Sequence, residues 1–136
     1  MAHDFTSYSD ETSPKYKLVF EEHPGYFFAC IEANETLDDL IQEYQNKIAH
    51  QISIRKYDRV MIKRDVPITN PAVELCAVIY KVKGWGLLKI KYAFVDVNPE
   101  HIDAYKFAVL YARSREIEIE VFEDILTAEH WLLADR

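Results

Sequence analysis

The feature that most constrains the fold is the regular alternation of strand-like and helix-like segments along the chain. Two short apolar runs come first, and helical patterns then alternate with further strand-like runs in the order ββαβαβαβα. Parallel neighbours in a sheet need a crossover connection, usually a helix, and this order supplies one between each later pair of strands. The sequence therefore predicts an α/β fold with a mixed, mostly parallel five-stranded sheet and helices on both faces.

Two segments near the start of the chain predict an antiparallel hairpin. Residues 17–22 and 26–33 are rich in aliphatic and aromatic side chains, which is typical of strands. A turn lies between them, because Pro24 sets a bend and Gly25 tolerates a positive φ. The remaining predicted strands are residues 59–63, 88–97 and 117–121. The last of these alternates glutamates with aliphatic residues, so we expect it at the edge of the sheet.

Other segments have a helical pattern. Residues 37–54 place apolar side chains three and four positions apart, so one helix face can pack on a sheet. Asn-Pro pairs at 70–71 and 98–99 each begin a further helix, because asparagine caps free N–H groups and proline is tolerated at the first position. We expect Trp131, in a short final helix, to be largely buried. The helices after the two Asn-Pro pairs are predicted over residues 70–83 and 99–114, and the final helix over residues 127–134.

Length and composition indicate one folded domain. The chain has 136 residues, of which 49% are hydrophobic and 29% charged, which is ordinary for a globular unit. Residues 1–14 are polar and have no hydrophobic period, so we expect a flexible N-terminal tail followed by a domain over residues 15–136. Deletion of residues 2–14 is then expected to leave stability nearly unchanged.

Charge and cysteine content argue against several classes of partner. Acidic residues number 23 and basic ones 16, and the net charge of -7 argues against nucleic acid or an anionic membrane as partner. The longest apolar stretch, residues 72–82, contains two charged residues and is too short for stable membrane insertion. Cys30 and Cys76 form no CxxC pair, which argues against a cysteine zinc site or a disulfide scaffold. Without an export signal, the expected location is the cytoplasm.

Motifs for catalysis, a cofactor or a metal are missing from the sequence. The glycines form no phosphate-binding loop, the histidines form no HExxH pair, and no serine lies in a GxSxG motif. We therefore expect no catalytic residue, no cofactor and no metal site.

Polar residues after two predicted strands form a candidate edge for a partner or ligand. Asp65 and Asp96 each end a predicted parallel strand, and open α/β sheets bind ligands at the carboxyl ends of their strands. Thr69, Asn70 and His101 follow these two strands and complete the candidate edge. The alternative is that the two aspartates only accept hydrogen bonds from neighbouring backbone N–H groups, as loop acids commonly do.

Motifs spread along the chain occur in an order that is typical of a known family. They are a hairpin with a Pro-Gly turn, an amphipathic helix, a strand ending in Asp-Val, and a closing V-F-x-D followed by A-x-x-W-L. Their positions are 24–25, 37–54, 96–97, 121–124 and 128–132. This order, over about residues 15–134, resembles the SpoIIAA-like branch of the STAS fold, the type of the anti-sigma-factor antagonists. In topology that branch is also similar to the CRAL-TRIO lipid carriers.

The resemblance implies a STAS-like fold and a non-catalytic module that acts by binding a protein partner. In the classical antagonists the loop after the third strand contains an Asp-Ser pair, and phosphorylation of its serine switches partner binding. Here residues 64–70 contain no such pair, and Thr69 is the only hydroxyl-bearing residue among them. The CRAL-TRIO likeness implies a second function, a carrier or sensor of a small apolar, lipid-like ligand. A third, an enzyme that uses Asp65 and Asp96, has the least support.

The predicted helix over residues 70–83 is apolar on more than one face. The apolar side chains beyond a single sheet-facing stripe include Leu75, Val78, Ile79 and Val82. A helix that is apolar all round must be covered, either by the neighbouring predicted helix, by an apolar ligand or by a second copy of the chain. We predict that these four side chains form the self-association surface of a homodimer.

Replacing Ile79 with aspartate tests this prediction. A charge in an apolar two-fold contact is strongly unfavourable, so Ile79→Asp is expected to convert a dimer into a folded monomer in analytical ultracentrifugation. If the unmodified protein already sediments as a monomer at tens of micromolar, the dimer prediction is wrong.

Overall fold

The computed structural model describes residues 8–11, 13–34, 38–67, 76, 80, 81 and 89–134. Within them a single sheet has its strands in the sequential order β1-β2-β3-β4-β5-β6. The strands are β1 (Tyr8–Asp10), β2 (Tyr16–His23), β3 (Tyr26–Ala33), β4 (Arg59–Asp65), β5 (Lys91–Asp96) and β6 (Glu118–Phe122). The helices are α1 (Asp38–Arg55), the 3-10 turn η1 (Pro99–His101), α3 (Ile102–Ser114) and α4 (Ile125–Leu133).

The predicted fold class is confirmed, with one strand more than expected. Strands β2 and β3 form the predicted antiparallel hairpin, and β3, β4, β5 and β6 are parallel neighbours. β6 lies at the edge of the sheet, as its alternation with glutamates predicted. Of the predicted helix over residues 70–83, only Cys76, Tyr80 and Lys81 are described, and these three are helical.

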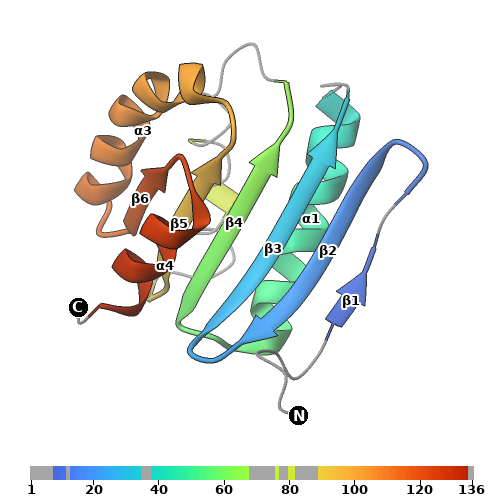
Figure 1. The fold of residues 1–136 in the computed structure, drawn as a ribbon, viewed down its shortest axis with the longest axis horizontal. Coiled ribbons are helices and arrows are strands. Elements are labelled where there is room, and N and C mark those ends of the chain that lie inside the picture. The colour runs from blue at the N-terminus through green and yellow to red at the C-terminus, as the bar shows by residue number, and fades with distance from the viewer. Residues whose placement is uncertain are drawn as a thin grey trace.

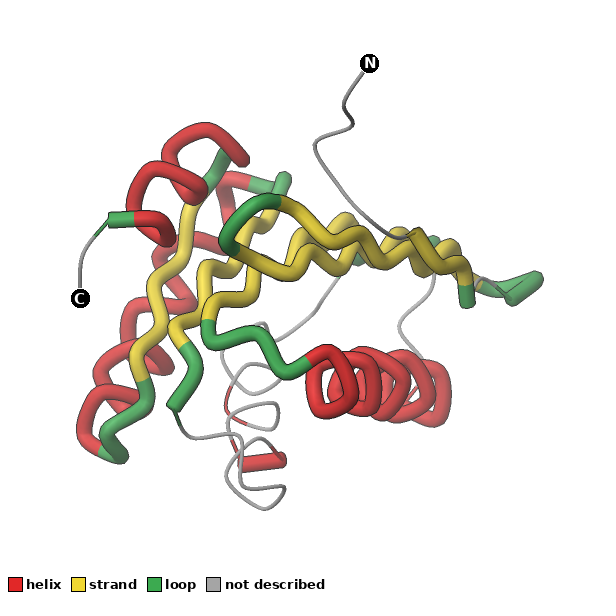
Figure 2. The backbone as a smooth tube through the Cα atoms, turned by 90° about the horizontal axis from the view of Figure 1, so that it is seen from below, coloured by secondary structure: helices red, strands yellow, loops and turns green. Residues whose placement is uncertain are grey.

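Helices cover both faces of the sheet (Figures 1 and 2). Side chains of α1 and α3, among them Tyr44 and Tyr105, pack with β2 to β6 in one large core cluster. On the other face, Ala128 and Leu132 of α4 pack with Met61, Ala93 and Val95 in a smaller cluster. In Figure 1, α4 lies in front of the β4–β5 side of the sheet, while α1 lies behind it.

The hairpin turn requires glycine for its backbone conformation, and it lies close to the last helix. Gly25 has a φ of 90°, a region that residues with a side chain rarely adopt. A Cβ at this position would also lie 2.9 Å from the Leu133 Cδ2 atom of α4. The turn therefore packs closely against the end of the last helix, and the Tyr26 hydroxyl donates a hydrogen bond of 2.7 Å to Glu129 of that helix.

Two cations from the sheet cap the end of α4. The Lys91 ammonium donates to the carbonyls of Trp131 (2.7 Å) and Ala134 (3.2 Å), and Arg59 donates to that of Leu133 (3.2 Å). Positive charge is favourable at a helix C-terminus, where carbonyls lack intrahelical partners. Trp131 is partly buried against the smaller cluster, so most of its surface is covered as predicted, and the Lys91 ammonium lies 4.4 Å from the centre of its ring. Leu132 is the fully buried anchor of α4.

The expectation of a flexible tail over residues 1–14 is wrong for its second half. Residues of β1 pair antiparallel with β2, which gives the sheet its additional edge strand. Glu11 then fixes the segment to α1: its carbonyl accepts from Lys47 (3.2 Å) and its carboxylate from Gln51 (2.7 Å). The physical reason is the free edge of β2, which needs partners for its backbone groups.

Deleting residues 2–12 is accordingly expected to destabilise the protein. The loss of β1 and of the Glu11 contacts removes several hydrogen bonds, each worth about 1 kcal/mol, so we expect a loss of about 1–3 kcal/mol. Chemical denaturation of the two proteins measures it. Deletion of residues 2–7, which keeps β1 and Glu11, is the control, and equal stability of all three proteins would contradict the contribution of β1.

Candidate functional site

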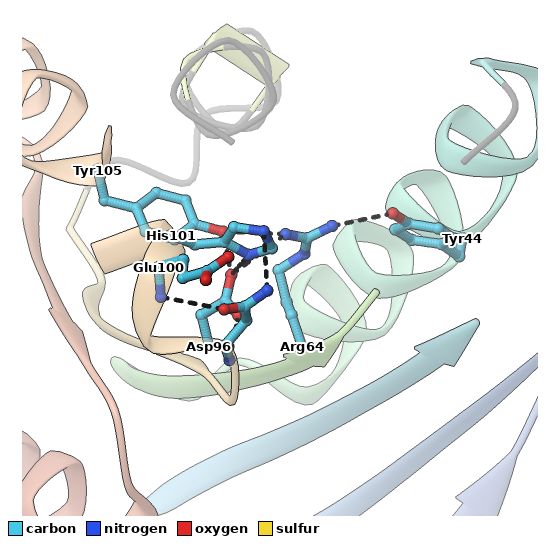
Figure 3. A network of polar contacts seen from close by, with 7 residues as sticks. Tyr44, Arg64, Asp96, Glu100, His101 and Tyr105 are labelled. Carbon is cyan, nitrogen blue, oxygen red and sulfur yellow. Dashed lines mark hydrogen bonds and ion pairs between the residues drawn. The ribbon is translucent and has the colours of Figure 1, made fainter. Parts of the chain in front are cut away.

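The candidate site is built where β4 and β5 end side by side. Arg64 and Asp96 are paired in register across these parallel strands, so both lie at the same edge of the sheet. Both side chains are buried, with exposed fractions of 3% and 1%. Figure 3 shows that Arg64 lies between Tyr44 of α1 and the group formed by Asp96, His101 and Tyr105.

The carboxylate of Asp96 is nearly saturated with hydrogen bonds. Its Oδ2 atom accepts from the Tyr105 hydroxyl (2.7 Å) and contacts the His101 Nδ1 atom (2.9 Å), and its Oδ1 atom accepts from the Asn98 N–H (2.9 Å). The Arg64 Nη1 atom lies 4.0 Å from Oδ2. A carboxylate offers about four acceptor positions. Asp96 therefore has little capacity left for a substrate or a metal.

Arg64 links the two helices that cover this face. One guanidinium nitrogen donates to the Tyr105 hydroxyl of α3 (3.0 Å) and another to the Tyr44 hydroxyl of α1 (3.2 Å). The Tyr105 hydroxyl thus accepts from Arg64 and donates to Asp96, which places it between the two charges. We refer to Tyr44, Arg64, Asp96, Asn98, His101 and Tyr105 as the edge network.

The contacts of Asn98 determine the tautomer of His101. The Asn98 Oδ1 atom accepts from the Glu100 N–H (3.0 Å), so the other side-chain atom of Asn98 is its amide nitrogen. That nitrogen is a donor and lies 3.3 Å from the His101 Nε2 atom, which must accept. His101 consequently has its proton on Nδ1 and donates to Asp96. The ring is held as an acceptor at one nitrogen and a donor at the other.

Burial raises the pKa of Tyr105 well above its ordinary value. Desolvation is the largest cause; the positive charge of Arg64 acts in the opposite direction, and the hydrogen bond to Asp96 adds to the increase. Desolvation also raises the pKa of Tyr26 and of Tyr92. These three phenols therefore favour the protonated form in the folded state.

The candidates that the sequence singled out are only partly brought together. Asp96 and His101 are in direct contact, and Asp96 accepts from a neighbouring backbone N–H, as the loop-acid alternative proposed. Asp65 is exposed and pairs in register with Glu32, on the side of the β2–β3 hairpin, where both line an open cavity of about 400 Å³. Thr69 and Asn70 lie outside the described residues, as do Leu75, Val78, Ile79 and Val82.

Arg64, Tyr44 and Tyr105 were missed as site residues. Arg64 is one of several basic residues in this part of the sequence, and its place in the alternation of strand side chains distinguishes it from the others. Side chains alternate between the faces of a strand, so Arg64 shares the face of Val60 and Ile62, which are core residues. An arginine at a core-facing strand end needs buried acceptors, and that requirement was the available signal.

Metal binding and membrane spanning find no support in the described part of the chain. No group of three or more histidine, cysteine, aspartate or glutamate side chains there is placed to hold a metal ion. None of the helices described is long and apolar enough to cross a membrane. Cys30 and Cys76 are free and half-buried, and desolvation raises the pKa of the Cys30 thiol.

Comparison with known proteins supports the fold. No family model matches the chain, and no curated protein matches it in sequence. The solved structure of RsbS from Moorella thermoacetica, in a serine-to-glutamate variant, aligns with a TM-score of 0.51 and 13% identity, over 83% of this chain and 92% of that one. RsbS is a STAS-domain regulator. The chain has a STAS-like α/β fold, which confirms the resemblance seen in the sequence at the level of the fold.

Replacing Asp96 with asparagine tests the edge network. The change leaves the buried Arg64 without its carboxylate, and removing one partner of a buried charged pair costs about 3–5 kcal/mol. Asp65→Asn, one residue after Arg64 but exposed, is the matched control and should change stability by no more than about 0.5 kcal/mol. Equal effects of the two substitutions in chemical denaturation would show that the network contributes nothing.

The buried tyrosines predict a loss of stability in alkali. A phenol with a raised pKa in the folded state binds its proton more tightly there than in the unfolded chain, so its contribution is complete below pH of about 10 and falls as pH rises above it. The ultraviolet absorbance of tyrosinate, followed with the melting temperature, measures this. Titration of all nine tyrosines near the ordinary pKa in the folded protein would contradict it.

Proposed function

We propose that the protein is a non-catalytic interaction module of the STAS type that binds a protein partner at the carboxyl ends of β4 and β5. The observation that supports this most directly is that the edge network uses its polar groups internally. Asp96 accepts from Tyr105, His101 and Asn98, and in this way it fixes the chain that follows β5 instead of presenting a reactive group. A surface that is already ordered favours binding, because the entropic cost of ordering side chains and loops is then small when the partner binds.

The surface supported by the network includes both polar and apolar groups. Asp65 is exposed at the end of β4, and Val97, at the end of β5, is 41% exposed. The Val97 N–H donates to the Arg64 carbonyl (3.2 Å), so the two strand ends are joined by a backbone hydrogen bond. Asn98 caps the following turn through the Glu100 N–H. The partner would thus meet a firmly held edge.

The structural neighbour agrees with this proposal. RsbS is a regulator with a STAS domain, and the present chain aligns with nearly all of it. By analogy of fold we propose a regulatory role, in the cytoplasm and through a protein partner. The second function, a carrier of a small apolar ligand, depends on the predicted helix over residues 70–83. The cavity of about 350 Å³ between α3 and β6, which has several apolar lining residues, is open to solvent rather than enclosed.

Site-specific photo-crosslinking in the native host tests the proposal. A photoreactive amino acid at position 65 or 97 is expected to capture one defined protein, because both positions lie on the proposed edge. The control is the exposed Ile54, at the end of α1 and close to the opposite edge of the sheet. The same capture from all three positions, or from none, would contradict the proposed edge.

Native mass spectrometry separates the two functions. The interaction module is expected to have the mass of the polypeptide alone or of a simple multiple of it. A carrier purified from its host would retain an apolar molecule as a discrete additional mass. Retention of such a ligand, together with a failed crosslink, would favour the carrier.

A further inference from the structure

A second surface lies along the outer edge of β6, the last strand in the order of the sheet. Among the described residues β6 pairs only with β5, and α3 runs beside it. An open groove of about 350 Å³ lies between them, lined by Ile102, Val109 and Leu110 of α3 and by Val121 of β6. Leu110 is 64% exposed although it is apolar. Of the edge network, Tyr105 alone also lines this groove.

The groove has the dimensions of a short strand. The lining residues of α3 extend from Ile102 to Arg113, which is about 16 Å at the rise of an α-helix. The five residues of β6 also extend over about 16 Å. A segment of about five extended residues could therefore lie along β6 and insert every second side chain into the groove.

The protein's own Glu120 occupies the edge of β6. Its Oε1 atom accepts from the Val121 N–H (3.1 Å), a backbone donor that faces away from β5, and its Oε2 atom accepts from Arg113 of α3 (2.6 Å). The Glu120 carboxylate thus accepts a hydrogen bond from a backbone N–H at the edge of the sheet. Without it, this N–H would be available to the carbonyl of an added strand. Glu120 and Arg113 are both partly exposed, at 33% and 52%, so the contact can open to solvent.

We propose that the β6–α3 groove binds an extended peptide segment of a protein partner, with an apolar side chain and, two residues along, an acidic one. The Val121 N–H would receive a peptide carbonyl, and Arg113 would receive the acidic side chain in place of Glu120. The apolar side chain would enter the groove beside Leu110. The present bond between Arg113 and a carboxylate is the observation that specifies an acidic residue.

A second copy of the chain is the less suitable occupant. Antiparallel pairing of β6 with β6 about a two-fold axis would place the side of Glu118 and Glu120 opposite the same residues of the other copy. Like charges directly opposite each other on paired strands are destabilising. Glu120 therefore opposes self-association while it holds the edge donor.

The experiment uses a synthetic peptide and the whole protein. The probe is an acetylated and amidated Thr-Val-Thr-Leu-Thr-Glu-Thr, titrated into isotopically labelled protein and followed by amide chemical shifts. Saturable shifts are expected at Ile119 to Phe122 and along the groove side of α3. The Glu120→Ala variant is expected to bind about tenfold more tightly, because one charge-assisted contact no longer competes.

Two controls separate the peptide site from other effects. In the Glu120→Ala background, Arg113→Gln should abolish the preference for glutamate over glutamine in the peptide, whereas Arg115→Gln, whose guanidinium lies over the Tyr111 ring, should retain it. N-methylation of both the leucine and the threonine after it should weaken binding at least tenfold, because successive N–H groups of a strand face opposite edges and one of these two faces β6.

Several results would overturn the proposal. These are the absence of saturable binding to either protein at millimolar peptide, shifts confined to other surfaces, and equal binding of the N-methylated peptide. Dimerisation of the Glu120→Ala variant that the peptide cannot reverse would instead identify a second copy as the occupant of the edge.

Discussion

Arg64 and Asp96 are buried at neighbouring strand ends, and the burial of two charges is costly unless each finds several partners. Here those partners come from three parts of the chain: Tyr44 from α1, Tyr105 from α3, and Asn98 and His101 from the turn between β5 and α3. Such a pair adds little net stability over an apolar alternative. We interpret the pair as a determinant of fold specificity, because this arrangement of β4, β5, α1 and α3 gives both buried charges their hydrogen-bond partners.

This constraint connects the fold to the proposed function. The parallel part of the sheet brings the ends of β4 and β5 together, and the edge network then fixes the residues that follow β5. At the amino ends of the same two strands, Arg59 of β4 and Lys91 of β5 bind the C-terminal end of α4. The two ends of the sheet thus have separate anchors, and a partner bound at the carboxyl edge would meet a surface that is already ordered.

Much of the fold was predictable because local signals and the global arrangement agree. The hairpin follows from Gly25, the helical segment after Asn98-Pro99 from its cap, and the edge position of β6 from its alternation with glutamates. The site was less predictable: Asp96 and His101 could be named from their place after β5, whereas Arg64 could be recognised only from its strand period. β1 has three residues and no pattern of its own, so its pairing depends on the free edge of β2 and on Glu11.

Hydrogen exchange of the Val97 and Asn98 amides tests the central claim most directly. Val97 donates to the Arg64 carbonyl and Asn98 to the Asp96 carboxylate, so both protons report on the edge network. We expect both amides to exchange only by global unfolding, at a rate set by the overall free energy of unfolding. Rapid exchange of both amides in the stable native protein, as in an unconstrained surface loop, would contradict the claim that the network holds this edge.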